Sequence, residues 1–244
     1  MRPLHGFRLC RLTACPVVTP YITPRPHYPT FTEVHMPKRS KMYSILHRTL
    51  AGFFRRVLVR VRIHGAENLP TEGGVVVCAN HISNFDPVIL AAALPRQVRF
   101  MAKIELFKIP LLGGALKMLG AFPVDRGAMD VGAVKTSIKL LKEGELVGIF
   151  PQGTRHKAKP PHESSVRHGA GMFAAKSEST LLPVFIGAKG HKIRLFRRLD
   201  LYIGEPITYE SLNVTHANMD EYVRISQFVF GEICALADKH GGER

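Results

Sequence analysis

A histidine and an aspartate five positions apart, His81 and Asp86, are the residues of this chain best suited to acid–base chemistry. A neutral imidazole can remove a proton from an alcohol near neutral pH. A carboxylate beside it would hold the ring in one tautomer and stabilise the imidazolium that forms, as in hydrolase triads. The same spacing would also arise from a helix cap beside an ordinary turn histidine, so the pair needs support from the rest of the chain.

The chain offers no signature of a covalent nucleophile. It lacks the Gly-x-Ser-x-Gly turn that presents a nucleophilic serine. None of its cysteines, Cys10, Cys15, Cys78 and Cys234, stands in a recognised nucleophile motif. We therefore predict that the histidine activates a hydroxyl group of the substrate itself, without a covalent intermediate.

The residues around the pair predict a strand, a turn and a helix. The β-branched run 75–79 is typical of a buried strand. Asp86-Pro87 before the Ala- and Leu-rich run 88–93 is typical of a helix N-cap followed by the first helical residue. His81 would then lie in a turn at the edge of a sheet, where α/β proteins often place functional residues. Backbone N–H groups near the start of this helix are the expected oxyanion donors.

Length and composition are those of one globular domain. The chain has 244 residues, of which 45% are hydrophobic and 22% charged, enough for one sizeable core. The four cysteines show neither the density of a disulfide scaffold nor metal-ligand spacing. This usage indicates a reducing compartment and argues against a structural zinc.

The net charge of +15 is concentrated near the N-terminus. Of this charge, +11 belongs to residues 1–66, where twelve Lys and Arg residues accompany one acid, Glu33; the remaining residues contribute +4. No apolar run approaches the roughly 18 residues that span a bilayer.

Residues 1–41 are predicted to be a basic, proline-rich leader. Repeated prolines exclude a continuous helix, and no apolar stretch is long enough for a secretory signal. These residues are a cationic leader, a disordered tail or a stretch upstream of the true start, for which Met36 and Met42 are candidates.

The next segment, residues 42–64, is predicted to associate with a membrane surface. A cationic amphipathic helix with aromatic side chains can lie in a bilayer interface and bind anionic lipids. The alternative is that its apolar side packs on the domain as ordinary core. Nucleic acid fits poorly as a partner, because no nucleic-acid-binding motif is present. The apolar positions at helical spacing are Tyr43, Leu46, Leu50, Phe53, Phe54 and Val57, with Lys41, Arg48, Arg55 and Arg56 close by.

Beyond this segment the pattern alternates between strands and helices. An outer strand is expected at 59–63, with further strands at 98–102, at 120–124, at 146–150 and within 193–203. Helices are expected at 106–119, broken at Pro110 and the following glycine pair, at 130–143 and at 219–237.

Two arginines at predicted strand ends could bind an anion. Arg126 follows the strand at 120–124, and Arg155 ends the loop Pro151-Gln152-Gly153-Thr154-Arg155. Glycine permits close backbone approach, threonine adds a hydroxyl, and arginine can bind a phosphate through two parallel hydrogen bonds. Either arginine alone could also be a solvated surface charge.

Four blocks of this sequence resemble the 1-acylglycerol-3-phosphate acyltransferases of phospholipid synthesis, and they occur in that family's order. The resemblance covers about residues 42–210. It implies a single glycerolipid-acyltransferase-like α/β domain, residues 65–240, in which helices flank a mixed β-sheet behind the amphipathic membrane-binding segment. The blocks are Asn80-His81 with Asp86, then Gly120 to Arg126, Phe150 to Arg155, and Leu182-Pro183-Val184.

The resemblance also implies roles for individual residues. His81 would be the base for attack by an acceptor hydroxyl on a fatty acyl thioester, and Asp86 would support it. Pro183 would be structural or lie on the acyl side, and a proline at a strand edge is the favoured interpretation. The implied substrate-binding residues are Arg126, Gln152, Gly153, Thr154, Arg155 and Lys103.

The implied enzyme is a 1-acylglycerol-3-phosphate O-acyltransferase that makes phosphatidate. The acyl donor would be acyl-CoA or acyl carrier protein, with no metal or redox cofactor. Partners would be anionic membrane lipids and the lysophospholipid, at the cytoplasmic face of the cell membrane as a peripheral or monotopic protein. Gln152 replaces the family's usual Glu, which leaves open another acceptor, such as glycerol phosphate or another lysolipid, or a non-catalytic membrane adaptor.

Overall fold

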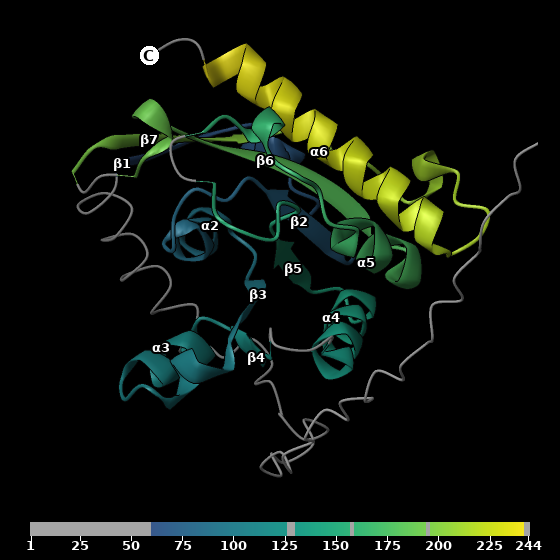
Figure 1. Ribbon diagram of the computed structural model, residues 1–244, viewed down its shortest axis with the longest axis horizontal. Coiled ribbons are helices and arrows are strands. Elements are labelled where there is room, and N and C mark those ends of the chain that lie inside the picture. The colour runs from purple at the N-terminus through teal and green to yellow at the C-terminus, as the bar shows by residue number, and fades with distance from the viewer. Residues whose placement is uncertain (1–59, 126–129, 157–158, 194–195, 242–244) are drawn as a thin grey trace, which may run out of the picture. The chain divides into compact units, whose positions relative to one another are not determined.

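The computed structural model describes residues 60–125, 130–156, 159–193 and 196–241. These residues form one seven-stranded sheet with helices on both faces (Figure 1), which confirms the predicted mixed α/β fold. The predicted leader and residues 42–59 of the predicted amphipathic segment lie outside the described residues. The last part of that segment, Arg60–His64, is an edge strand of the sheet.

The sheet is mostly parallel, with a reversal near one side. Its spatial order is β1-β7-β6-β2-β5-β3-β4. The last five strands in this order are mutually parallel, whereas β7 is antiparallel to β6 and β1 is parallel to β7. The strands are β1 (Arg60–His64), β2 (Val75–Ala79), β3 (Val98–Lys103), β4 (Phe122–Val124), β5 (Leu146–Ile149), β6 (Thr180–Ala188) and β7 (Arg198–Ile203).

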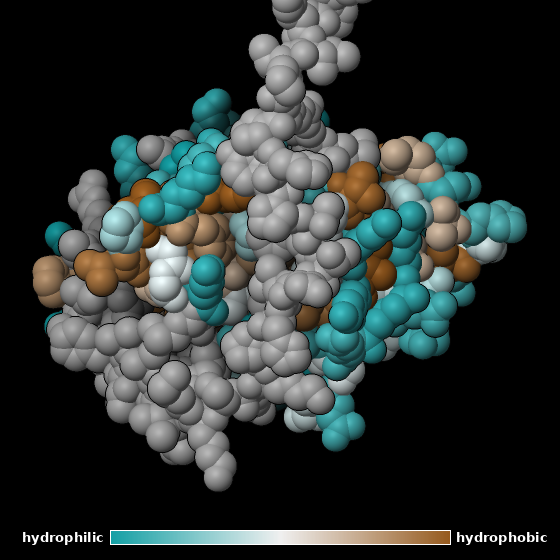
Figure 2. Space-filling view, turned by 90° about the horizontal axis from the view of Figure 1, so that it is seen from below, coloured by the Kyte–Doolittle hydropathy of each residue, from teal (hydrophilic) through white to brown (hydrophobic). Residues whose placement is uncertain are grey.

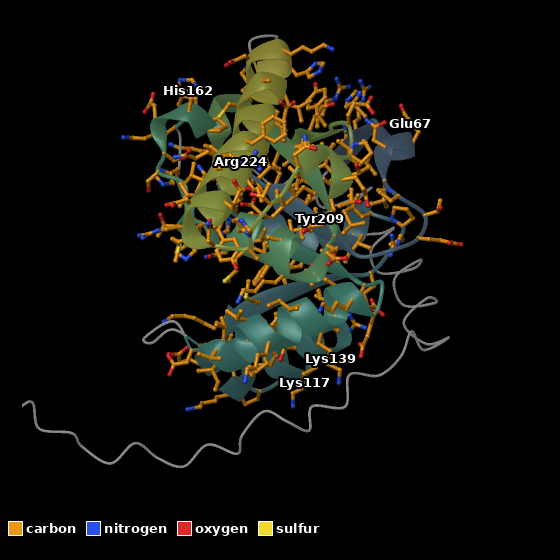
Figure 3. The ribbon with its side chains drawn as sticks, turned by 90° about the vertical axis from the view of Figure 1, so that its right-hand side faces the viewer. Glu67, Lys117, Lys139, His162, Tyr209 and Arg224 are labelled. Carbon is orange, nitrogen blue, oxygen red and sulfur yellow. The ribbon has the colours of Figure 1, made fainter. Side chains whose placement is uncertain are left out.

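Helices cover the sheet unequally. On one face α2 packs over the strands, and on the other α4, α5 and α6 form a layer (Figure 1). Figure 3 shows α6 with Arg224 at one end of this layer and Lys139 of α4 at the other. The helices are α2 (Asp86–Ala93), α3 (Leu112–Met118), α4 (Val131–Lys142), α5 (Gly169–Ser177) and α6 (Met219–Gly241). None of the helices in the described ranges has both the length and the apolar character needed to cross a bilayer.

The position of β2 in the sheet explains why its sequence is continuously apolar. All five of its residues are buried. Val75 and Val77 face the α2 side, while Val76 and Cys78 face the layer of α4, α5 and α6. A strand covered on both faces has no solvent-exposed side, so an unbroken β-branched run is the expected pattern.

Segments leaving the parallel strands meet at one edge of the sheet. The carboxyl end of β2 leads into residues 80–85, that of β3 into residues 104–111, and that of β5 into residues 150–168. Every sequence-predicted site residue within the described ranges follows or ends one of these strands. The parallel topology thus gathers side chains that are far apart in the sequence.

Helix α2 begins one residue earlier than predicted. Asp86 is its first helical residue, and Phe85 is the N-cap. The Asp86 carboxylate does not cap α2. It accepts hydrogen bonds from the amides of Ile82 and Ser83, which precede the helix. The carboxylate therefore organises the turn that contains His81.

Proline 183 lies inside the sheet and not at its edge, contrary to prediction. It belongs to β6, which pairs with β2 on one side and β7 on the other. The Pro183 carbonyl accepts a hydrogen bond from Gly204 N, just past the end of β7. Since the N–H and C=O of a strand residue point to the same neighbour, proline removes only the reciprocal bond to Gly204, at the end of the β6–β7 ladder.

Other predicted elements match closely. Asp130 caps α4 by accepting from Ala133 N at 2.9 Å, and Gly144 follows that helix with φ +82°. The region 106–119 is broken as predicted, into a 3-10 turn at Ile104–Lys108 and α3.

The sequence interpretation missed α5. This short helix is buried on most sides, so its residues show no amphipathic period.

Candidate active site

His81 and Asp86 form a hydrogen-bonded pair in the turn between β2 and α2. His81 Nδ1 lies 2.7 Å from Asp86 Oδ2. The imidazole is 13% exposed and the carboxylate is fully buried. The two side chains come from one six-residue stretch, so the turn itself brings them together.

The hydrogen bonds of Asp86 define the tautomer of His81. Asp86 Oδ2 also accepts from the backbone N–H groups of Ile82, at 2.7 Å, and Ser83, at 2.8 Å. An ionised carboxylate only accepts, so His81 Nδ1 must donate, and Nε2 of the neutral ring then carries the lone pair. No hydrogen bond among the described residues uses Nε2. This nitrogen can take a proton from a substrate.

Aromatic stacking supports the imidazole from the side. The Phe150 ring lies on the His81 ring, with centroids 4.1 Å apart and planes 17° apart. Phe100 stacks in turn on Phe150 at 5.9 Å. Gly148 makes room for this arrangement, because a Cβ there would lie 2.1 Å from Phe100 Cε1. The sequence interpretation quoted Phe150 only as part of a block and assigned it no role.

The backbone of His81 is held from both sides by the loop after β5. Gln152 Oε1 accepts from His81 N at 2.6 Å, and the N–H of His156 donates to His81 O at 2.9 Å. Gln152 is 2% exposed, and its Nε2 donates to Ser164 Oγ at 2.8 Å. Ser164 Oγ donates to Pro161 O at 2.6 Å. Both ends of the Gln152 amide are thus engaged within the protein.

Asn80 anchors the other side of the turn. Its buried side chain accepts from Ile186 N at 2.6 Å and donates to Ile186 O at 3.2 Å. This pair of bonds joins the end of β2 to β6 across 106 positions of sequence. The sequence block included Asn80, but only the fold reveals its partner.

The loop after β5 brings Arg155 to the same turn. Arg155 Nη1 donates to Asn84 Oδ1 at 2.5 Å, and the guanidinium is exposed. Thr154 is exposed and its Oγ1 lies 3.5 Å from His156 Nε2. Gly153 has φ +70°, and a Cβ there would lie 2.9 Å from Arg167 Cγ. The glycine therefore serves both the turn and its packing.

Of the other two predicted binding residues, Lys103 lies within the described residues and Arg126 lies outside them. Lys103 ends β3 at the same edge of the sheet, and its ammonium is 3.8 Å from Glu105 Oε1. The hydrogen bonds and ion pairs of the described residues do not join Lys103 to His81 or Arg155.

Four amides near the start of α2, where oxyanion donors were expected, already have partners. Asp86 accepts from Ile82 N and Ser83 N, Ser83 Oγ accepts from Phe85 N, and Ser83 O accepts from Asp86 N. A donor that is already bonded is not available to a developing oxyanion. These four amides are therefore poor candidates for the oxyanion hole, and the other N–H groups near the helix start stay the predicted donors.

The described cysteines are not poised as nucleophiles. Burial raises the pKa of the Cys78 thiol, which lies in β2. Burial, and to a lesser extent Asp238, raises the pKa of Cys234. A thiol must ionise to attack, so both remain poor nucleophiles. The described residues also contain no group of three or more His, Cys, Asp and Glu side chains placed to hold a metal ion.

Comparisons with known proteins agree with this geometry. Residues 60–187 match the family model named acyltransferase. The chain is 39% identical over 150 residues to the 1-acyl-sn-glycerol-3-phosphate acyltransferase of Bacillus subtilis, covering 60% of this chain and 73% of that protein. It is 34% identical over 149 residues to the enzyme of that name from Streptococcus pneumoniae, covering 59% of this chain and 54% of that protein.

A solved structure is similar over most of the chain. The crystal structure of the 1-acyl-sn-glycerophosphate acyltransferase PlsC from Thermotoga maritima superposes with a TM-score of 0.65 and 25% identity. The match covers 86% of each chain.

Proposed function

This chain belongs to the 1-acylglycerol-3-phosphate acyltransferase family, and on that basis we propose that it transfers a fatty acyl group from a thioester to the free hydroxyl of lysophosphatidate. The observation that carries the proposal is the buried Asp86 carboxylate bonded to His81 Nδ1. That bond leaves Nε2 as the basic nitrogen of the ring. The products are phosphatidate and a free thiol.

The reaction needs one proton acceptor and one proton donor, and His81 serves as both. Nε2 removes the proton of the acceptor hydroxyl as its oxygen attacks the thioester carbonyl carbon. The tetrahedral intermediate then expels the thiolate, which takes the proton back from Nε2. Asp86 stabilises the imidazolium between these steps. A positioned base typically contributes about 10²–10⁴-fold to the rate, and the rest comes from orienting the two substrates.

The phosphate of the acceptor is the natural ligand of the arginine loop. Arg155 is exposed beside the His81 turn, and its bond to Asn84 orients the guanidinium. We assign Arg155, with Gly153 and Thr154, to phosphate binding. Lys103, at the end of β3, and Arg126, which lies outside the described residues, complete the proposed set.

Gln152 bears on the alternative acceptors. Its amide oxygen bonds His81 N and its amide nitrogen bonds Ser164, so it acts on the site through the position of His81. A residue engaged in this way has little reach toward a glycerol hydroxyl. The replacement of Glu by Gln152 therefore gives no reason to choose another acceptor or a non-catalytic adaptor. We favour an enzyme that acts on lysophosphatidate over these alternatives.

The donor and location are part of the same proposal. Either acyl-CoA or acyl carrier protein would bring the thioester, and no further cofactor is invoked. The acceptor resides in a bilayer, so we place the protein peripherally on the cytoplasmic face of the membrane, with residues 42–59 and anionic lipids contributing to attachment.

An acceptor and donor survey tests this function. The purified full chain is given labelled acyl-CoA or acyl carrier protein with lysophosphatidate, glycerol phosphate, lysophosphatidylcholine or lysophosphatidylglycerol. The proposal expects lysophosphatidate to give the highest kcat/KM. If it ranks among the poorest acceptors, the substrate assignment fails, and if no acceptor is acylated, the adaptor alternative replaces it.

A further inference from the structure

Two segments at the carboxyl edge of the sheet each contain an exposed apolar residue whose backbone has a positive φ angle. Leu111, after β3, has φ 65° and is 93% exposed. Phe196, before β7, has φ 62° and is 64% exposed. Side chains other than glycine rarely adopt positive φ, and large apolar side chains are not favoured in water. Strained residues of this kind tend to gather at functional surfaces.

The strain at Leu111 has a defined geometry. Leu112 N donates to Pro110 O at 2.7 Å, and Leu111 has φ 65° and ψ −46°. This is the rare γ-turn with positive φ at its central residue, which directs the Leu111 side chain outward. Further exposed apolar residues lie beside it, and Lys108 adds a positive charge. We call Leu106, Ile109, Leu111 and Leu112 the leucine tip.

The segment around Phe196 is strongly basic. Residues 189–198 contain five Lys or Arg and no acid. Arg198 is also aligned with Arg60 of the neighbouring strand β1. Like charges directly opposite each other in a sheet are destabilising, and a bound anion would reduce their repulsion. We call Phe196, Arg197 and Arg198 the phenylalanine tip.

Strand directions place both tips on the edge that bears His81. Strands β3 and β6 are parallel to the other core strands, so the segments after them leave from the same edge as the turn after β2. The leucine tip follows β3 and the phenylalanine tip follows β6. Figure 2, seen from the side on which α3 lies, shows hydrophobic atoms at the surface beside hydrophilic ones.

We propose that the two tips are a membrane-contact surface, which inserts Leu111 and Phe196 into the interface of an anionic bilayer. The adjoining basic side chains bind lipid phosphates, and the two contacts turn the His81 edge toward the bilayer. Exposed apolar side chains next to Lys and Arg favour binding at the interface of an anionic bilayer. The inference rests on the proposed function for the lipid nature of the acceptor, and it assigns the surface through which that lipid is reached.

Glycine variants test the surface without harming the fold. Glycine accepts positive φ, so Leu111→Gly and Phe196→Gly remove the apolar side chain while relieving strain. We expect each to weaken binding of the full chain to phosphatidylcholine vesicles containing phosphatidylglycerol by about tenfold, and the double variant by roughly a hundredfold. The control is Phe228→Ala, which removes a 47% exposed aromatic ring from the middle of α6 and should leave vesicle binding unchanged.

Activity measurements separate this inference from the proposed function. The double variant should acylate a short-chain lysophosphatidate dissolved as monomers at the wild-type rate, and long-chain lysophosphatidate in vesicles at least tenfold more slowly. Unchanged vesicle binding by the double variant would overturn the inference. An equal loss on both acceptors would also overturn it, because the tips would then belong to the substrate site. If no acceptor is acylated by the wild type, the proposed function fails, while the vesicle measurement still decides the surface.

Discussion

The amide oxygen of Gln152 lies 2.6 Å from the backbone nitrogen of His81. This bond links the loop after β5 to the turn after β2, across 71 positions of sequence. Because Gln152 is buried and also bonds Ser164, its effect on catalysis passes through the placement of the imidazole. Three of the predictions below follow from groups that place or polarise that ring.

Gln152→Glu should retain activity, whereas Gln152→Ala should not. A glutamate oxygen can still accept from His81 N, but alanine leaves a buried N–H without its acceptor, at a cost of about 1–3 kcal/mol. We expect kcat within a few-fold of wild type for the glutamate variant and at least tenfold lower for the alanine variant. The ratio of kcat/KM between lysophosphatidate and glycerol phosphate should be the same in wild type and Gln152→Glu. A changed ratio would mean that Gln152 selects the acceptor directly.

Asp86→Asn should lower kcat with little change in KM. Asparagine can accept from the same amides, but it lacks the charge that stabilises the imidazolium. The expected loss is about 10²–10⁴-fold in kcat. Steady-state kinetics, with circular dichroism as the check on folding, measure this. Wild-type kcat in the folded variant would show that the carboxylate only shapes the turn.

Gly148→Ala should disturb the ring stack behind His81. The new Cβ would meet Phe100 at 2.1 Å, so Phe100, and through it Phe150, must shift. Overpacking of this kind typically costs about 1–3 kcal/mol of stability, and we expect kcat to fall as well. The matched control is Gly231→Ala in α6, where a Cβ meets nothing within 4 Å and the free energy of unfolding should be unchanged or higher. Equal behaviour of the two variants would contradict the packing account.

Arg155→Ala and Arg126→Ala should each raise KM for lysophosphatidate far more than KM for the acyl donor. A lost charged hydrogen bond to phosphate is worth about 1.5–3 kcal/mol, or roughly ten- to a hundredfold. Initial-rate measurements with each substrate varied in turn give the two constants. Equal effects on both substrates would assign the arginine a structural role.

The Glu221–Arg224 pair makes a small, pH-dependent contribution to stability. The hydrogen bond from Arg224 lowers the pKa of Glu221 in the folded state, and Arg224 also donates to Leu212 O at 2.7 Å. The stabilisation is therefore present above the unfolded pKa of Glu221 and is lost as pH falls through its lower folded value. We expect Glu221→Gln to lower Tm slightly near pH 7 and to equal wild type in acid. A Tm difference that grows toward low pH would contradict this sign.

Sequence reasoning predicted the parts of the site that are local. His81 and Asp86 lie on one turn, and the strand and helix around them follow from patterns within a few residues. Arg155 was predicted to bind the phosphate because it follows a strand end and because the resemblance implies that role. Its contact with Asn84 spans 71 positions and has no signal in either segment alone.

The features that sequence reasoning missed depend likewise on contacts or backbone angles that no local pattern shows. Pro183 was assigned to an edge because a proline interrupts a ladder, but it lies where the β6–β7 ladder ends beside Gly204, so only one bond is lost. Four of the helix-start amides could not be set aside as oxyanion donors, because the sequence does not show where the Asp86 carboxylate points. The strained turn at Leu111 depends on a positive φ angle, which the run Pro110-Leu111-Leu112 does not predict.

The rate of acyl transfer by His81→Ala tests the central claim most directly. The variant is purified, shown to be folded by its thermal transition, and assayed beside wild type with labelled acyl-CoA or acyl carrier protein and lysophosphatidate. The account predicts that phosphatidate formation falls by at least about 10²-fold, with vesicle binding unchanged. Phosphatidate formation at the wild-type rate by the folded variant would contradict it.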